Sequence, residues 1–158
     1  MEYLEDISIG TTTLIGRHTF TTDEIKSFAS QFDPQPFHLD EAAAARSLFG
    51  RLCASGWHSA AMCIRLIMDR HREQQAERHA RGEPAVRLGL SPGFRELKWL
   101  KPVCVGDTIT YAGEVSDKRA SKSRPGWGLL TIRYTGTNEG GELVLSFVST
   151  VFVERRPQ

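Results

Sequence analysis

Residues 57–68 read WHSAAMCIRLIM, and this stretch has the strongest helical pattern in the chain. Its apolar positions recur at helical spacing, at Ala60, Ala61, Ile64, Ile67 and Met68. We therefore predict a helix that begins near Trp57 and buries a wide apolar stripe against another element. Residues 69–83 continue it with mostly charged side chains of both signs, which indicates either a solvated helical extension or a mobile flap.

Upstream of this helix the sequence predicts one strand and two shorter helices. Residues 11–20 are rich in Thr, Leu and Ile, which favours a strand. Thr21 and Glu24 have the spacing of a capping box, so a helix is expected from there to about Asp33. A polar turn with two prolines leads to Asp40, a good N-cap for a short helix over residues 42–45 that ends near Gly50.

Downstream of residue 84 the pattern changes to strands separated by turns. Five segments qualify, namely Val86 to Leu90, Phe94 to Leu100, Asp107 to Val115, Trp127 to Asn138 and Leu143 to Val153. Residues 102–106 and 139–142 carry the turn signals between them. The order of one strand, a helical half and then hairpin-spaced strands predicts an α+β fold, with an antiparallel sheet and helices on one face.

The composition fits a single globular domain, which we place at residues 1–158. The chain has 158 residues, and its 20 Lys and Arg balance 19 Asp and Glu to a formal net charge of +1. Because nucleic-acid-binding domains usually carry a clear basic excess, this balance argues against a nucleic-acid partner.

The cysteines and the N-terminal sequence bear on the cellular compartment. Cys53, Cys63 and Cys104 form an odd, sparse set without a C-x-x-C spacing, which argues for a reducing interior rather than a disulfide framework. Residues 1–6 have no basic or apolar region of a signal peptide, and no run approaches the ~18 apolar residues of a membrane span. We therefore expect a cytoplasmic protein with no membrane partner.

The densest chemistry lies in residues 31–40, QFDPQPFHLD, which bring Asp33 and His38 into one turn. Prolines at 34 and 36 restrict that turn, and apolar neighbours supply low-dielectric walls. Fixed geometry and an environment that shifts pKa values are what a catalytic acid–base pair requires. The alternative is that this proline-rich turn is only a connector between two helices.

The other histidines give no metal site. No pair among His18, His58, His71 and His79 has the H-x-x-x-H spacing, and no cysteine stands at a zinc-type spacing from them. His58 falls on the apolar helix and is interpreted as a hydrogen-bonded core residue.

Residues 33–40, DPQPFHLD, resemble the D-x-x-P-x-H-x-D hydratase motif of the MaoC-like acyl dehydratases, the (R)-specific enoyl-CoA hydratase family. Supporting similarities follow in chain order: the Ala42 to Ala45 helix, Phe49, the small-residue step 54–57 and the KPVCVGDT segment at 101–108. The resemblance covers nearly the whole chain, and the hydratase motif is its most specific part.

This resemblance implies a hot-dog fold, in which an antiparallel sheet wraps around one long central helix. It also implies an acyl-CoA thioester as the partner, no cofactor, and a homodimer or higher homo-oligomer with sites near the subunit boundary. Exposed sheet edges give self-association a physical reason, because an open edge must be covered.

The same resemblance implies roles for three residues. Asp33 and His38 would hold the water that adds to the enoyl thioester, and the backbone N–H of Gly56 would stabilise the charge on the thioester oxygen. Without the motif, Gly56 is equally a glycine that starts a helix. Many relatives have His-Gly-Met here where this chain has Ser55-Gly56-Trp57, and Trp57 would either narrow the acyl site or pack in the core.

Three functions follow from the resemblance. Hydration of trans-2-enoyl-CoA, or the reverse dehydration of 3-hydroxyacyl-CoA, agrees best with the Asp33 and His38 spacing. The alternatives are an acyl-CoA thioesterase on the same fold and a non-catalytic subunit that binds acyl-CoA. Basic residues at 118, 119, 122 and 124 form either a contact for CoA phosphates or, as we favour, a solvated hairpin tip.

Overall fold

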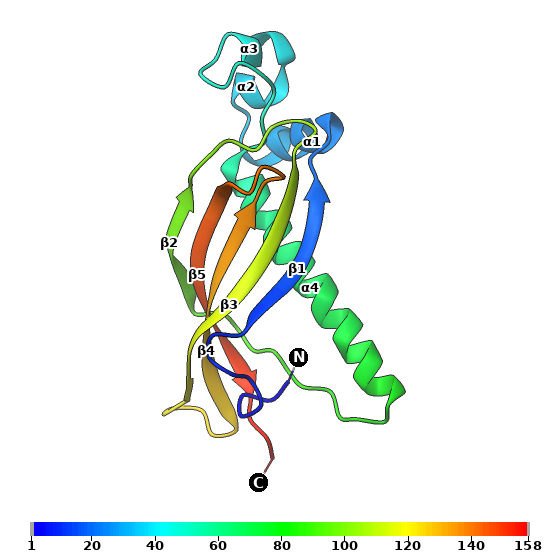
Figure 1. Cartoon of the computed structure of the whole chain (residues 1–158), viewed down its shortest axis with the longest axis vertical. Coiled ribbons are helices and arrows are strands. Elements are labelled where there is room, and N and C mark those ends of the chain that lie inside the picture. The colour runs from blue at the N-terminus through cyan, green and yellow to red at the C-terminus, as the bar shows by residue number, and fades with distance from the viewer. Residues whose placement is uncertain (1, 158) are drawn as a thin grey trace.

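A five-stranded antiparallel sheet forms the body of the protein, as the computed structural model of residues 2–157 shows (Figure 1). Its strands lie in the order β1-β3-β4-β5-β2, so β1 and β2 are the two edges. The strands are β1 (Thr12–Thr19), β2 (Gly93–Trp99), β3 (Thr108–Ala120), β4 (Trp127–Thr137) and β5 (Leu143–Glu154).

Four helices stand between β1 and β2 in the chain. They are α1 (Thr22–Phe32), α2 (Pro36–Leu39), α3 (Glu41–Ala45) and α4 (Gly56–Ala80). The 25-residue α4 crosses one face of the sheet, while α1 to α3 gather beyond one end of the strands (Figure 1). This arrangement confirms the α+β class and the hot-dog fold, with α4 as the central helix.

The starts of α1 and α3 form where the sequence predicts them, but α3 ends at Ala45 rather than near Gly50. Thr21 accepts a hydrogen bond from the backbone of Glu24, whose carboxylate accepts one from the Thr21 backbone, so the capping box of α1 is complete. Asp40 caps α3 through the Ala43 backbone N–H at 2.7 Å. The single turn α2 was not predicted, because a four-residue helix carries no periodicity and Pro36 at its first turn reads equally as a loop signal.

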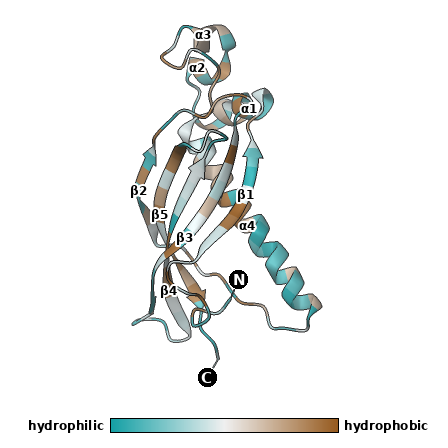
Figure 2. Ribbon diagram, in the orientation of Figure 1, coloured by the Kyte–Doolittle hydropathy of each residue, from teal (hydrophilic) through white to brown (hydrophobic). Residues whose placement is uncertain are grey.

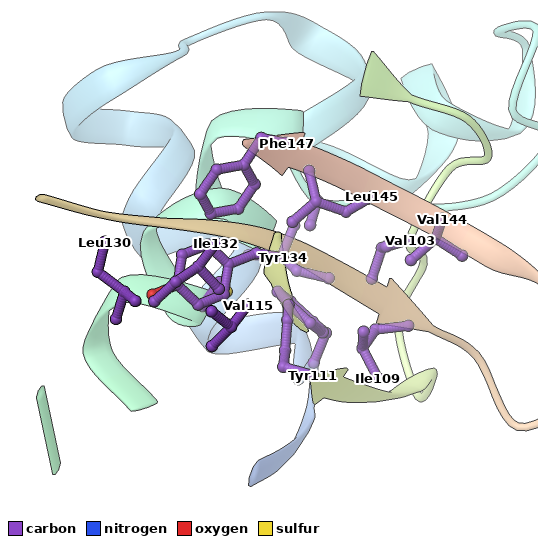
Figure 3. Packing of buried hydrophobic residues seen from close by; sticks show 14 of the residues in the cluster. Val103, Ile109, Tyr111, Val115, Leu130, Ile132, Tyr134, Val144, Leu145 and Phe147 are labelled. Carbon is purple, nitrogen blue, oxygen red and sulfur yellow. The ribbon is translucent and has the colours of Figure 1, made fainter. Parts of the chain in front are cut away.

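The hydrophobic core lies between α4 and the concave sheet. Cys63 of α4 is fully buried, as are Ile109 and Tyr111 of β3, and Figure 3 shows the side chains of β3, β4 and β5 packed together there. The Tyr111 hydroxyl donates to the backbone carbonyl of Ser59 at 3.0 Å. This bond fixes the first turns of α4 against the sheet, which positions the start of the helix.

The charged half of α4 continues as helix to Ala80, which confirms the solvated extension rather than a flap. Figure 2 shows this half in the colour of hydrophilic residues. The return segment was predicted as a strand over 86–90, but only an isolated bridge forms, between Leu88 and Val153. Backbone hydrogen bonds to β5 still hold this segment, from the Gly89 N–H to the Phe152 carbonyl at 2.8 Å and from the Phe152 N–H to the Leu90 carbonyl at 3.1 Å. The side-chain carbonyl oxygen of Gln75 also accepts from the Val86 N–H at 3.1 Å.

The interpretation that the three cysteines form no disulfide is wrong. Cys53 and Cys104 are joined by a disulfide bond, and only Cys63 is a free thiol among the described residues. The two partners stand 51 residues apart in the chain, and the spacing therefore gave no signal of their pairing. They meet because the segments around them form a short antiparallel bridge. Within residues 2–157, no helix is long and apolar enough to cross a membrane.

Candidate active site

Asp33 and His38 face each other in a cleft at the end of the sheet nearest α1. The Nε2 atom of His38 lies 3.6 Å from the Oδ2 atom of Asp33, and their side chains are 6% and 19% exposed. That gap is longer than a direct hydrogen bond, and both atoms are largely sheltered. The pair can therefore share one small polar molecule between two fixed groups.

The local backbone explains why the two side chains meet. Asp33 is the C-cap of α1, and its N–H donates to the Ala29 carbonyl at 2.9 Å. Pro34 ends that helix, since a residue before proline is disfavoured in helical conformation. Pro36 then starts α2, and the single turn places His38 on its inner side, 5% exposed. The prolines of the motif thus set the direction of both side chains.

A buried hydrogen bond fixes the imidazole of His38. Its Nδ1 atom lies 2.6 Å from the backbone carbonyl oxygen of Cys53. Because a carbonyl only accepts, Nδ1 carries the proton of this bond, and Nε2 is the ring nitrogen left to accept a proton on the side of Asp33. His38 is therefore oriented as a proton acceptor on the side of the cleft.

Asp33 is held as a carboxylate by three neighbours. The Ser55 hydroxyl is the largest influence that lowers its pKa, against an opposing effect of burial. The side-chain amide of Gln35 donates to Asp33 Oδ1 at 2.8 Å, and His38 adds an electrostatic contribution. A lowered pKa keeps Asp33 ionised at neutral pH, and it can then only accept hydrogen bonds.

Ser55 is a site residue that the sequence did not single out. It is 1% exposed, and as the N-cap of α4 its Oγ accepts from the Trp57 N–H at 3.2 Å. The same hydroxyl can then donate its proton to Asp33, so one residue joins the start of α4 to the Asp33 carboxylate. The only sequence signal was that a serine stands where many relatives carry histidine.

Gly56 is required by a close approach of an aromatic ring. A Cβ atom at this position would lie 2.6 Å from the Cε2 and Nε1 atoms of Trp99. The Trp99 indole also donates from Nε1 to the Gly56 carbonyl at 2.8 Å. As the first residue of α4, Gly56 has no intrahelical acceptor for its N–H, and none occurs among the described residues. This N–H is a free donor at the positive end of the helix.

These residues line one cleft of about 460 Å³. Its walls are mainly apolar and aromatic, with Phe37 and Phe49 beside His38, and Lys101 at one side. Trp57 contacts Trp99 edge to face with ring centroids 5.0 Å apart, but it is 51% exposed. Of the two roles considered for Trp57, packing in the core does not occur, because its side chain stands at the rim of the cleft.

Two further expectations concern residues outside the cleft. His58 is buried beneath Phe28, with parallel rings 4.6 Å apart, but its Nδ1 atom has no hydrogen-bond partner among the described residues, contrary to the expected bonded state. Burial is the main cause that lowers its pKa to about 4. No group of metal-ligating side chains occurs in the described part of the chain.

The basic hairpin is far from the cleft. The turn between β3 and β4 lies at the opposite end of the sheet from α2 and α3 (Figure 1). Lys118 donates to the backbone carbonyls of Leu4, Glu5 and Ile7, which anchors the N-terminal segment. This placement supports the interpretation as a hairpin tip over a contact for CoA phosphates.

The fold and cleft define a hot-dog protein with an Asp–His pair beside the start of its central helix. Residues 8–128 match the family described as the MaoC like domain, and the chain belongs to this family. The family includes hydratases and dehydratases, which agrees with the resemblance of residues 33–40.

Known proteins support this assignment at different levels. A MaoC-like dehydratase from Rhodospirillum rubrum has 37% sequence identity with the chain, a TM-score of 0.81 and full coverage of both chains. The 3-hydroxybutyryl-CoA dehydratase of Methylorubrum extorquens is 27% identical over 115 residues, 73% of this chain and 64% of that protein. The uncharacterized protein YdeM of Bacillus subtilis is 25% identical over 152 residues, 96% of this chain and 99% of that protein.

Proposed function

We propose that this protein hydrates trans-2-enoyl-CoA to 3-hydroxyacyl-CoA, or catalyses the reverse dehydration, as a hydro-lyase. The observation that carries the proposal is the 3.6 Å separation of His38 Nε2 and Asp33 Oδ2 in a sheltered cleft. A gap of this size fits a water molecule that is hydrogen-bonded to both groups. Membership of the MaoC family and the 3-hydroxybutyryl-CoA dehydratase relative support the same reaction class.

In this proposal His38 and Asp33 divide the work of activating the water. The lone pair of His38 Nε2 accepts a proton from the water, while the Asp33 carboxylate accepts its second hydrogen bond and orients it. The water oxygen then bonds to Cβ of the enoyl group as the double bond shifts toward the thioester, and the proton that His38 took from the water passes to Cα, which returns His38 to its starting state. Positioned proton transfer of this kind contributes roughly 10²–10⁴ in rate.

Gly56 is proposed to stabilise the negative charge that develops on the thioester oxygen. Its N–H is unpaired at the N-terminus of a 25-residue helix, where the backbone dipoles favour an anion. Loss of one such donor typically lowers turnover by about 10²–10³. No cofactor enters any of these steps.

The acyl tail is proposed to extend past Trp57 into an apolar cavity. That cavity has a volume of about 410 Å³ and lies beside Phe28, Ala60, Ile64 and Phe94. Trp57 lines both this cavity and the cleft of Asp33 and His38, so its side chain stands between the two. The size of residue 57 would then set which acyl groups fit.

We also propose that residues 1–158 act as one domain in a homodimer or higher homo-oligomer. The edge strand β2 supports self-association, because it exposes Phe94 and Trp99 at 59% and 44%. An exposed apolar strand at a sheet edge needs a partner. A second copy would cover this edge next to the cavity that Phe94 lines.

The function is tested by following the loss of the conjugated absorbance of crotonyl-CoA and longer or branched enoyl-CoA substrates with the purified chain. Asp33→Asn and His38→Gln should each reduce turnover by about 10²-fold or more, since each removes one half of the water site. Asp117→Asn and His79→Gln are matched controls on exposed residues and should leave turnover unchanged.

Two results would contradict the proposal. Hydration that is undiminished in both Asp33→Asn and His38→Gln would exclude the pair as the water site. Release of free CoA thiol from acyl-CoA without hydration would show a thioesterase, and tight acyl-CoA binding without turnover of any enoyl-CoA would show a binding subunit.

A further inference from the structure

A third cavity, separate from the cleft and from the cavity proposed for the acyl tail, lies on the other half of α4, between that helix and the sheet. It has a volume of about 370 Å³, within the range of roughly 300–1,000 Å³ that is usual for small-molecule sites. It shares no lining residue with the catalytic cleft. Because a helix rises about 1.5 Å per residue, Arg70 in this cavity stands roughly 21 Å along α4 from Gly56.

The floor of this cavity is apolar. Four buried side chains of β3 and β4 form it, with one partly buried side chain from β1 and one from α4. In that order they are Val115, Leu130, Ile132, Tyr134, Ile15 and Ile67. Such a surface favours a hydrocarbon chain over water, because each buried CH₂ group contributes about 0.8 kcal/mol.

One wall of the cavity carries polar atoms that lack partners. The Nε atom of Arg70 and the Nδ1 atom of His71 are buried, and neither has a hydrogen-bond partner among the described residues. The other arginines of α4, namely Arg65, Arg72 and Arg78, each form an ion pair with a carboxylate. Arg70 alone among them has none within the described part of the chain. A buried guanidinium nitrogen without a hydrogen-bond partner is costly, and an anion at this wall would supply the missing acceptor.

The charges around the cavity favour a monoanion. Burial lowers the pKa of His71, so its ring is neutral at pH 7, and Arg70 is the one cation among the described residues that line the cavity. Two carboxylates also line the cavity, but Asp6 already accepts from Arg156 at 2.5 Å and Glu2 is exposed to water. One guanidinium matches a carboxylate by its fork of N–H donors. A dianionic phosphate would carry a second negative charge that no cation balances and that the carboxylates of Asp6 and Glu2 repel.

We propose that this cavity is a second ligand site, which binds an aliphatic monocarboxylate with its head group at Arg70 and its tail on the apolar floor. The inference does not depend on the hydratase activity, since it concerns a cavity with separate lining residues. It would allow a free fatty acid to occupy the protein while the catalytic cleft is engaged.

The test is NMR titration of the full ¹⁵N-labelled chain with octanoate, with acetate and octan-1-ol as probes of the head and the tail alone. Octanoate should shift the amides of residues 67–74 and 113–115, and bind about tenfold or more tightly than either partial probe. Arg70→Met should weaken octanoate binding by about tenfold or more, and Arg70→Lys by less, because lysine keeps the charge without the fork. Arg72→Met, on the exposed side of the same helix, should bind octanoate as the wild type does.

Several outcomes would overturn this site. Octanoate shifts confined to residues 33–57 would show binding in the catalytic cleft only. Equal weakening by Arg70→Met and Arg72→Met would show general charge attraction, and unchanged affinity in Arg70→Met or Arg70→Lys would exclude the guanidinium as the head-group contact. If Arg70→Met does not give a native spectrum, the Arg70→Lys comparison decides.

Discussion

The Nδ1 atom of His38 lies 2.6 Å from the carbonyl oxygen of Cys53, whose own side chain is bonded to Cys104. The carbonyl that fixes the imidazole therefore belongs to a residue tied covalently to the segment after β2. On either side of this bond, Ala54 N–H donates to Val103 O at 2.7 Å and Val105 N–H to Leu52 O at 2.9 Å. Two backbone hydrogen bonds and one disulfide thus fix the position of the Cys53 carbonyl, which in turn orients the His38 ring.

The first prediction concerns the contribution of this disulfide to stability. Cys104→Ser should lower the free energy of unfolding by about 4 kcal/mol, because the bond closes a loop across 51 residues and restricts the unfolded chain. Turnover should fall by less than about tenfold, since the two flanking backbone bonds remain and still position the Cys53 carbonyl. Urea denaturation and enoyl-CoA kinetics measure the two effects.

Reductant provides the control for this prediction. Dithiothreitol should destabilise the wild type to the level of Cys104→Ser and leave that variant unchanged. A thiol assay in denaturant should find one free thiol in the oxidised wild type and three after reduction. Three thiols before reduction, in protein purified without reductant, would contradict the bond.

The second prediction assigns Ser55 as a positioning residue for Asp33. Ser55→Ala removes the hydroxyl that is the largest cause of the lowered Asp33 pKa. That pKa should rise, and since the water site needs the ionised carboxylate, the acid limb of the kcat profile should move to higher pH. The variant should also lose about 1 kcal/mol of stability, because the N-cap of α4 is removed.

Ser55→Thr separates these two effects from a general loss of fold. Threonine keeps a hydroxyl that can cap the helix and donate to Asp33, and its acid limb should stay near that of the wild type. An acid limb that is the same in Ser55→Ala and the wild type would show that Ser55 acts on the helix alone.

Much of the fold could be predicted because its strongest signals are local. The capping box at Thr21 and Glu24, the Asp40 cap and the apolar stripe from Ala60 to Met68 each depend on neighbours within one or two helical turns. The strands β3 to β5 alternate visibly enough to be placed. β3 nevertheless runs to Ala120, five residues beyond its predicted end at Val115, since its exposed half carries polar residues that resemble a loop.

The candidate site was predictable only in part. The motif gave Asp33 and His38 because their spacing lies within a single turn of chain. Ser55, Cys104 and Trp99 could not be placed there from sequence, because each reaches the site through tertiary contacts across more than 15 residues of chain. Trp99, 43 residues from Gly56 in the chain, also supplies a reason for the glycine that the sequence did not show, because its ring leaves no room for a Cβ atom at residue 56.

The third prediction tests that relation. Gly56→Ala would bring a methyl group to 2.6 Å from the Trp99 ring, so the ring must move and its bond to the Gly56 carbonyl is lost. We expect a loss of about 1–3 kcal/mol in stability and a marked fall in turnover. Trp99→Leu makes room, and the double variant should be more stable than the sum of the two single losses implies. Additive losses in urea denaturation would show that the two residues do not conflict.

The last prediction concerns the dependence of stability on pH through His58. Burial lowers its pKa in the folded protein from 6.5 to about 4, an effect that the charge of Glu24 opposes and that of His18 reinforces. Between these two values the unfolded chain binds the proton more readily, so stability is full above about pH 6.5 and falls as the pH drops toward 4. A difference of this size corresponds to about 3 kcal/mol.

His58→Phe, which keeps a ring against Phe28, should remove that part of the acid sensitivity in urea titrations at pH 7 and pH 4. His79→Gln, on the exposed face of α4, should retain it, and an equal acid loss in His58→Phe and the wild type would exclude His58 as its source.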